Sequence, residues 1–204
     1  MQSRSFAGVG ILVLIILVIA GVIGGTYNSL VSLGQAVDAQ WAQVQNVYQR
    51  RADLVPNLVA TVKGAANFEK STYVAVAQAR SRVGQVAPQT VQNAPNDPQA
   101  FSQYEQAQNQ LGAALSRLLV VVERYPDLKA TSNFATLQAQ LEGTENRITV
   151  ERMRYNEAAR AFNTRRDSIP AVLFVSMFGQ KFNEKNYFKA QSGAETAPAV
   201  DFSK

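Results

Sequence analysis

The chain has 204 residues, with 20 Lys and Arg against 15 Asp and Glu, a net charge of +5, and neither His nor Cys. It therefore contributes no disulfide, no lipid-modified cysteine and no catalytic or zinc site that needs His or Cys. Because the basic residues are interspersed with acidic ones, a solvated helical surface is favoured over nucleic-acid binding.

The first feature along the chain is an uncharged apolar run, FAGVGILVLIILVIAGVIGG, over residues 6–25. Twenty helical residues at about 1.5 Å each span the roughly 30 Å hydrocarbon core of a bilayer. The alternative is a cleavable signal peptide, whose apolar region normally has about 7–15 residues. The length of the run predicts a retained transmembrane anchor, within an N-terminal region of residues 1–26.

The orientation of this anchor is predicted from flanking charge, because Lys and Arg favour the cytoplasmic side. Arg4 and the terminal amine precede the apolar run, whereas the next basic residue is Arg50. The charge difference favours a cytoplasmic N-terminus and an extracytoplasmic soluble domain.

Two pairs of small residues end the apolar run. Ala20 and Gly24, and likewise Gly21 and Gly25, are four residues apart. This spacing permits close packing of helices in lipid. Helix termination explains the glycines equally well, so formation of a homo-oligomer is left open.

Three long helices are predicted after the anchor. Apolar residues at steps of three and four run from Leu30 to Val83 and predict that the first helix continues about 80 Å beyond the lipid. Asp97 and Pro98 form a typical helix start, and Pro126 ends that second helix. Thr131 or Ser132 caps the third helix, whose apolar stripe extends from residue 134 to 162.

A short apolar fourth helix is predicted from Pro170 to Phe178, ended by Gly179. No segment alternates with period two. The predicted fold is therefore all-α, a transmembrane helix followed by an antiparallel up-and-down bundle of three long helices and a short one. The bundle occupies residues 27–179. Residues 180–204 form an extended or disordered tail, whose Phe182, Tyr187, Phe188 and Phe202 could dock on the bundle.

Two charged residues fall on otherwise apolar helix stripes. Arg51 lies on the stripe of the first helix and Glu151 on that of the third. Because unpaired burial of a charge costs several kcal/mol, an interhelical pair is predicted, either Arg51–Glu151 or Asp53–Arg152. Such a pair could fix helix register alone or form part of a binding site. The candidate structural or interaction residues are Arg50, Arg51, Asp53, Asn57, Glu151, Arg152, Tyr155 and Asn156.

The carboxylates offer a weaker candidate. Glu142 and Glu145 are three residues apart on one helix face, but Asn146 and Arg147 beside them favour a polar surface patch over a metal site. We therefore predict no catalytic residues, no cofactor and no metal.

Several sequence blocks are more specific than a generic helical pattern: YNSLV at 27–31, Trp41, RRADLVPNLV at 50–59, ERYPDLKA at 123–130, ENRI at 145–148, MFG at 177–179 and VDF at 200–202. Together they resemble the LemA family of bacterial membrane-anchored proteins. The resemblance implies an N-terminal transmembrane helix and an up-and-down helical bundle in the bacterial cell membrane. Gly34, Gln180 and Asn186 depart from the family pattern. The family is described with a small N-terminal part outside the cell, opposite to the charge-based orientation.

The molecular function of that family is poorly defined, so the resemblance predicts fold and location rather than activity. Long helices, an anchor and no catalytic inventory favour a non-enzymatic, single-pass scaffold or adaptor for other membrane or envelope proteins. The alternative is a self-assembling protein that remodels membranes or sheathes pores. An enzyme would need a carboxylate-only or Ser-Lys site. The expected partners are the lipid bilayer and membrane or envelope proteins, without nucleic acid.

Overall fold

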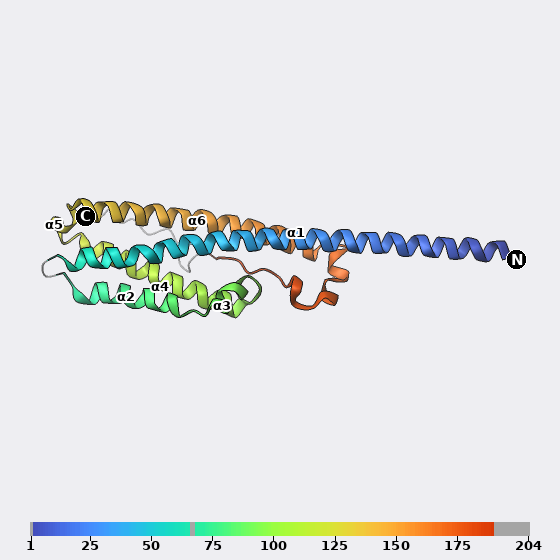
Figure 1. Ribbon diagram of the computed structural model, residues 1–204, viewed down its shortest axis with the longest axis horizontal. Coiled ribbons are helices and arrows are strands. Elements are labelled where there is room, and N and C mark those ends of the chain that lie inside the picture. Colours follow the sequence, from blue (N-terminus) through green and yellow to red (C-terminus); the bar gives the residue numbers. More distant parts are fainter. Residues whose placement is uncertain (1, 66–67, 190–204) are drawn as a thin grey trace, which may run out of the picture.

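The computed structural model describes residues 2–65 and 68–189, and it is all-α within them, as predicted. Helix α1 (Gln2–Lys63) has 62 residues, and its N-terminal part projects from the bundle (Figure 1). Side chains from residue 8 to residue 25 are exposed, and Thr26 is the first buried one. In the described part of the chain, α1 alone is long and apolar enough to cross a membrane, and none of its most apolar 18-residue window is buried.

Four helices run up and down in the bundle. They are the C-terminal part of α1, α2 (Lys70–Gln85), α4 (Pro98–Val122) and α6 (Ser132–Asp167). Helix α6 lies along α1, and α2 packs on both α1 and α4 (Figure 1). The connections contain α3 (Pro88–Asn93), η1 (Ala94–Asn96) and α5 (Pro126–Lys129). The predicted antiparallel bundle is confirmed, with α1, α4 and α6 as its long helices.

The prediction that the first helix continues to Val83 is wrong. Helix α1 ends at Lys63, and the chain reverses so that residues 70–85 form α2 beside it. Gly64 is a poor helix former, and its N–H is shared between the carbonyls of Ala60 and Thr61. The reversal buries the apolar face of α2, which a straight rod would leave in water. Because both arms keep the same spacing of apolar residues, periodicity cannot locate the break.

The predicted helix starts are confirmed. Asp97 Oδ1 accepts hydrogen bonds from the backbone N–H groups of Gln99 (2.9 Å) and Ala100 (3.3 Å), with Pro98 in the first helical position. Thr131 Oγ1 accepts from the N–H of Phe134 at 3.3 Å. These side chains satisfy amides that have no partner inside their own helices.

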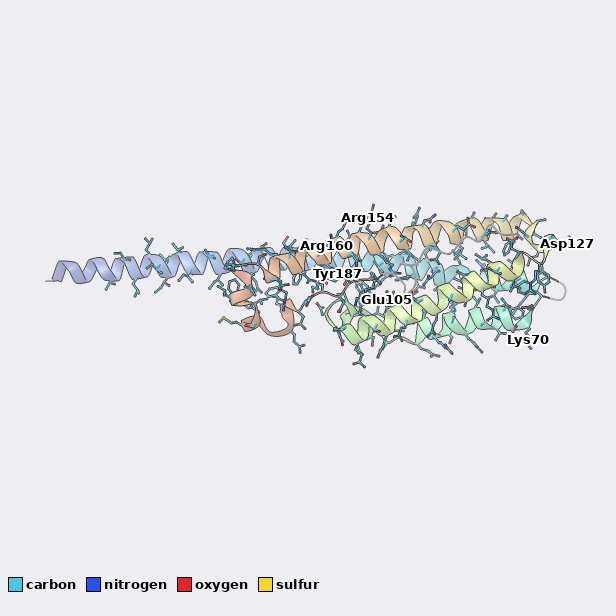
Figure 2. All side chains as sticks on the ribbon, turned by 180° about the vertical axis from the view of Figure 1, so that it is seen from behind. Lys70, Glu105, Asp127, Arg154, Arg160 and Tyr187 are labelled. Carbon is cyan, nitrogen blue, oxygen red and sulfur yellow. The ribbon has the colours of Figure 1, made fainter. Side chains whose placement is uncertain are left out.

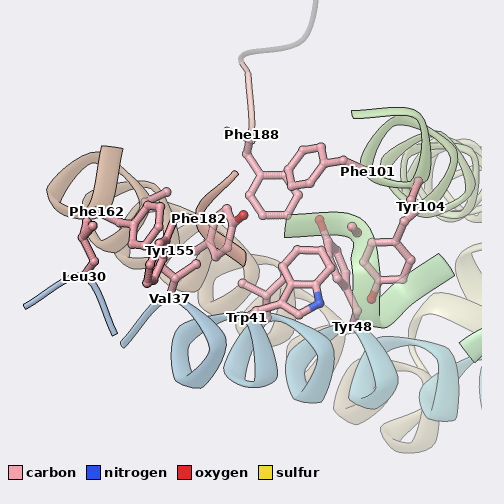
Figure 3. Packing of buried hydrophobic residues seen from close by; sticks show 14 of the residues in the cluster. Leu30, Val37, Trp41, Tyr48, Phe101, Tyr104, Tyr155, Phe162, Phe182 and Phe188 are labelled. Atoms are coloured by element: carbon pink, nitrogen blue, oxygen red, sulfur yellow. The ribbon is translucent and has the colours of Figure 1, made fainter. Parts of the chain in front are cut away.

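Two apolar clusters fill the bundle. The proximal core lies nearer the projecting part of α1 and is rich in aromatic residues (Figure 3); its largest members are Trp41, Tyr48, Phe101, Tyr104, Tyr155, Phe162, Phe182 and Phe188. The distal core lies toward the α1–α2 turn and is mainly aliphatic; its members include Val55, Leu58, Val62, Val76, Leu111, Leu115, Leu118 and Leu141. Arg51 lies between the two clusters in the sequence of α1.

The C-terminal segment, which comprises residues 169–189, folds back on the bundle. The predicted short helix is present as 3₁₀ turns, η2 (Ala171–Leu173) and η3 (Val175–Phe182), rather than as an α-helix. Gly179 does not end it but bends it, with φ of 60°, a backbone conformation that favours glycine. Residues 183–189 then lie against the bundle without regular structure, and Phe188 is buried. Phe202 lies outside the described residues.

Candidate functional site

Arg51 on α1 is buried at the boundary between the proximal and distal cores. Its side chain is 4% exposed. Nη2 donates hydrogen bonds to the backbone carbonyl (2.8 Å) and Oε1 (2.7 Å) of Gln108 on α4. Nη1 lies 3.2 Å from Glu145 Oε1 on α6. The guanidinium therefore joins three helices, and its five donors in a rigid fork suit this role.

The pairing predicted for Arg51 is wrong, although its burial is as predicted. Glu151 pairs with Arg154 on its own helix at 2.8 Å. The spacing of apolar residues placed Glu151 on the apolar stripe of α6. In the structure Glu145, about two turns earlier on α6, is the carboxylate that lies level with Arg51. The carboxylate of Glu145 is 42% exposed, so it reaches the buried cation from the solvent side.

The space around Arg51 is set by small and aromatic neighbours. A Cβ at Gly112 would lie 3.3 Å from Arg51 Nη1, closer than ordinary contact. The ring of Tyr48 lies on another side, with its centroid 5.0 Å from Arg51 Cζ, a cation–π distance. Arg51 Nε is buried without a hydrogen-bond partner. The site thus holds a cation that is well enclosed but not fully satisfied.

A second bridge joins α4 and α6 nearer the projecting part of α1. Arg152 Nη2 on α6 lies 3.1 Å from Glu105 Oε1 on α4 and donates to the carbonyl of Lys189 at 3.1 Å. Burial raises the pKa of Glu105, and this effect outweighs the lowering by Arg152. The predicted Asp53–Arg152 pair is not formed, since the exposed Asp53 accepts from Gln49 on its own helix.

The two bridges border a groove of about 650 Å³ between α4 and α6. Its lining includes Tyr48, Arg51, Gln108, Gly112, Glu145 and Arg152. The groove offers cationic donors, an amide and a carboxylate at the rim, which can form hydrogen bonds with a polar segment of another protein. No group of three or more acidic side chains that could hold a metal occurs among residues 2–65 and 68–189.

The other predicted residues have different surroundings. Asn156 fixes the C-terminal segment, donating to the carbonyl of Phe188 (2.9 Å) and accepting from its N–H (3.0 Å). Tyr155 is fully buried in the proximal core, and burial raises its pKa. Arg50, Asp53 and Asn57 are exposed and do not line the groove.

Sequence reasoning missed Gln108 and Glu105 and assigned Glu145 to a surface patch. The sequence did indicate that Gln108 would be buried, because it occupies an apolar-stripe position between Tyr104 and Leu111. In the structure Gln108 is 2% exposed. Figure 2 shows Glu105 on α4 and Tyr187 on the C-terminal segment, which line one shallow pocket. The expectation that apolar residues of the tail could dock on the bundle is confirmed for the buried Phe182 and Phe188, but no pattern indicated that Phe188 would return to Phe101 on α4.

The small residues of the anchor remain a prediction. Ala20, Gly21, Gly24 and Gly25 are exposed, and a Cβ built at any of these glycines would meet nothing within 4 Å. They are therefore free to face lipid or a second helix.

Together, the projecting apolar helix and the helical bundle define a membrane-associated all-α protein. The profile of the LemA family matches residues 40–202, so the chain belongs to the LemA family. It is similar to Magnetosome protein MamQ 2 and Magnetosome protein MamQ 1 of Paramagnetospirillum magneticum, each 24% identical over 184 residues, covering 83% of this chain and 67% of the relative. Magnetosome protein MamQ of Magnetospirillum gryphiswaldense is 23% identical with the same coverage.

Proposed function

We propose that this chain is a single-pass membrane protein whose bundle serves as a non-enzymatic scaffold or adaptor for other envelope proteins. The observation that carries the proposal is the continuity of α1. One uninterrupted helix, which contains Pro56, runs from the exposed apolar segment into both cores, and Val37 and Val62 at distant points of it are fully buried. A bundle fixed to its anchor in this way presents its surfaces at a set height and angle above the membrane.

The groove between α4 and α6 is the surface that we assign to partner binding. It combines the partly satisfied Arg51 with Glu145 and Arg152 at its walls. Charged groups held by a rigid framework give specificity to protein–protein contacts. The competing interpretation is that Arg51 only fixes the register of α1, α4 and α6, as buried polar groups can do.

The test is capture of partners after cross-linking in native membranes, using the full chain. The groove variant replaces Arg51 with Met and Glu145 with Leu, which removes both charges without stranding either. The matched control replaces Arg124 with Met and Glu69 with Leu, an exposed bridge of 2.8 Å outside the groove. We expect the groove variant to lose partners that wild type and control both retain, at comparable melting temperatures. If all three capture the same partners, the groove is structural only.

A second candidate function is lateral self-assembly that remodels the membrane. The exposed pairs Ala20–Gly24 and Gly21–Gly25 support it, because small residues at this spacing permit close helix contact in lipid. Sedimentation of the detergent-solubilised chain separates the two functions. Large rings or filaments that disappear in a Gly21→Leu and Gly25→Leu variant would favour assembly over a scaffold role.

For orientation, we propose a cytoplasmic N-terminus and an extracytoplasmic bundle in the bacterial cell membrane, from the flanking charges. The chain has no Cys, so single cysteines at Ser3 and Gln89 report topology without background. In intact spheroplasts, an impermeant maleimide should label Gln89→Cys and not Ser3→Cys. The reverse pattern would place the bundle in the cytoplasm.

A further inference from the structure

Among the described residues outside α1's projecting part, the most exposed large apolar side chains lie together in the C-terminal segment. Ile169, Leu173 and Met177 are 77%, 73% and 81% exposed, and Val172 is also exposed. The opposite side of the same segment is buried through Ala171, Phe174, Val175 and Phe182. The segment is thus held firmly by one face while its other face presents four large apolar side chains to the outside. Clusters of this kind mark interaction surfaces.

The position of this segment along α1 identifies what covers its apolar face. The Tyr27 ring lies 5.2 Å from the ring of Phe178 and 5.5 Å from that of Phe182. Tyr27 comes two residues after Gly25, where the apolar run ends, which is about 3 Å along a helix. The headgroup layer of a bilayer is roughly 5–7 Å thick on each side of the hydrocarbon core. With the apolar run of α1 spanning a bilayer, this places the segment at the level of the headgroup layer; Figure 1 shows it beside α1 where that helix leaves the bundle.

The charges around the segment suit the same location. Arg165 at the end of α6 donates to Thr26 Oγ1 (3.2 Å) and Ser29 Oγ (3.3 Å), which fixes it beside the first buried turn of α1. Lys181 donates to the Tyr27 hydroxyl and lies 4.8 Å from the centroid of its ring. Residues 160–181 contain Arg160, Arg165, Arg166 and Lys181 against one acidic residue, Asp167. Cations beside apolar side chains are typical of segments that lie in the membrane interface.

We propose that residues 169–177 insert their exposed apolar face into the interface of the same bilayer that α1 spans. This inference rests on the proposed function, in which α1 is a transmembrane anchor. The lipid surface is favoured as the occupant because the segment packs on Tyr27, directly after the exposed apolar run of α1, and exposes large apolar side chains there. Two contacts with one membrane, one through the bilayer and one at its surface, prevent the bundle from tilting or rotating about α1.

The test uses single cysteines in the otherwise Cys-free full chain, labelled with an environment-sensitive fluorophore and reconstituted into vesicles of phosphatidylcholine and phosphatidylglycerol. Leu173→Cys and Met177→Cys report on the segment. Leu14→Cys reports on the anchor, and Val120→Cys is the matched control, because Val120 is an exposed apolar residue (70%) on α4 in the distal half of the bundle. Circular dichroism confirms that each labelled protein is folded.

We expect labels at 173 and 177 to be quenched by lipids brominated near the headgroup and protected from aqueous iodide. The label at 120 should show the opposite pattern, and the label at 14 should respond only to deeply brominated lipid. If iodide quenches 173 and 177 as strongly as 120 while 14 stays deep, the inference is wrong and the anchor stands. Iodide access to 14 would overturn the proposed transmembrane function itself. Protection of 173 and 177 in native membranes but not in pure lipid vesicles would assign the face to a protein partner and overturn the lipid assignment.

Discussion

The proximal and distal cores stabilise the two ends of the bundle by different means. The proximal core brings together aromatic rings from α1, α4, α6 and the C-terminal segment, with Trp41 in contact with Phe101, Tyr104, Tyr155 and Phe188. The distal core interleaves Val and Leu from α1, α2, α4 and α6. Aromatic side chains bury roughly 150–250 Å² each, so a few of them can join segments whose backbones are far apart.

The difference in composition between the two cores corresponds to the segments that each core connects. The proximal end must join α1 to a C-terminal segment that has no regular structure after Phe182, and Phe188 reaches the rings of Trp41 and Phe101 from there. The distal end only has to close a helical hairpin, for which aliphatic ridges and grooves suffice. We infer that the proximal core determines how the bundle sits on its anchor, whereas the distal core contributes stability alone.

The largest expected effect is that of Trp41→Ala in the proximal core. It removes a buried side chain with four ring neighbours and the hydrogen bond from Nε1 to the Val91 carbonyl at 2.9 Å. The expected loss is about 3–5 kcal/mol in the free energy of unfolding. Urea unfolding followed by far-ultraviolet circular dichroism measures it, since Trp41 is the only tryptophan and its fluorescence is lost.

The comparison variant is Leu115→Ala in the distal core, at a site that is 2% exposed. It should lower the free energy of unfolding by about 2–5 kcal/mol. In addition, only Trp41→Ala should release the C-terminal segment, seen as faster proteolysis after Lys185 or Lys189. Equal proteolysis in both variants would contradict the separate role of the proximal core.

The next effect concerns the boundary between the cores. Glu145→Leu leaves Arg51 buried with Gln108 as its remaining polar partner, and it should cost about 1.5–3 kcal/mol, as for a hydrogen bond to a charged group. Adding Arg51→Met should recover much of the loss. Denaturant unfolding of both variants measures this. As a comparison, Glu151→Leu should cost less than Glu145→Leu, because Glu151 pairs only with the exposed Arg154 and its Oε2 is buried without a hydrogen-bond partner. A larger loss for Glu151 than for Glu145 would reverse the assignment of the pair.

A smaller effect is expected at the start of α4, which carries Phe101 and Tyr104 into the proximal core. Asp97→Ala removes an acceptor for two backbone amides and should cost about 1 kcal/mol. Asp97→Asn keeps an acceptor oxygen and should lose much less. Thermal unfolding of the two variants decides this, and equal losses would mean that the side chain's hydrogen bonds do not matter.

The two cores also differ in how well the sequence predicts them. The distal stripe positions, the helix caps and the burial of Arg51 follow from spacing and residue type. The break after Lys63 does not, because a hairpin preserves the apolar spacing on both sides. The partner of Arg51 depends on the relative shift of α1 and α6, which a stripe count fixes only to within two turns. The proximal core depends on the return of residues 183–189, which is directed by hydrogen bonds of Asn156 and Asn163 that no periodicity indicates.

The smallest effect is a pH dependence confined to the proximal end, at Glu105. Burial raises the pKa of Glu105 above its ordinary value of 4.5, although Arg152 and Lys189 oppose the shift. The folded state therefore binds a proton more readily than the unfolded state in the pH range just above 4.5. Glu105 then supports folding most at low pH, and this contribution is lost as the pH rises through its folded pKa. Glu105→Gln does not titrate, so its stability relative to wild type should improve between pH 4 and pH 7. Because all other carboxylates are shared, the difference between the two melting curves isolates this residue. An unchanged difference at the two pH values would show that burial and the Arg152 bridge cancel at Glu105, and a fall in the relative stability of Glu105→Gln would show that the bridge outweighs burial.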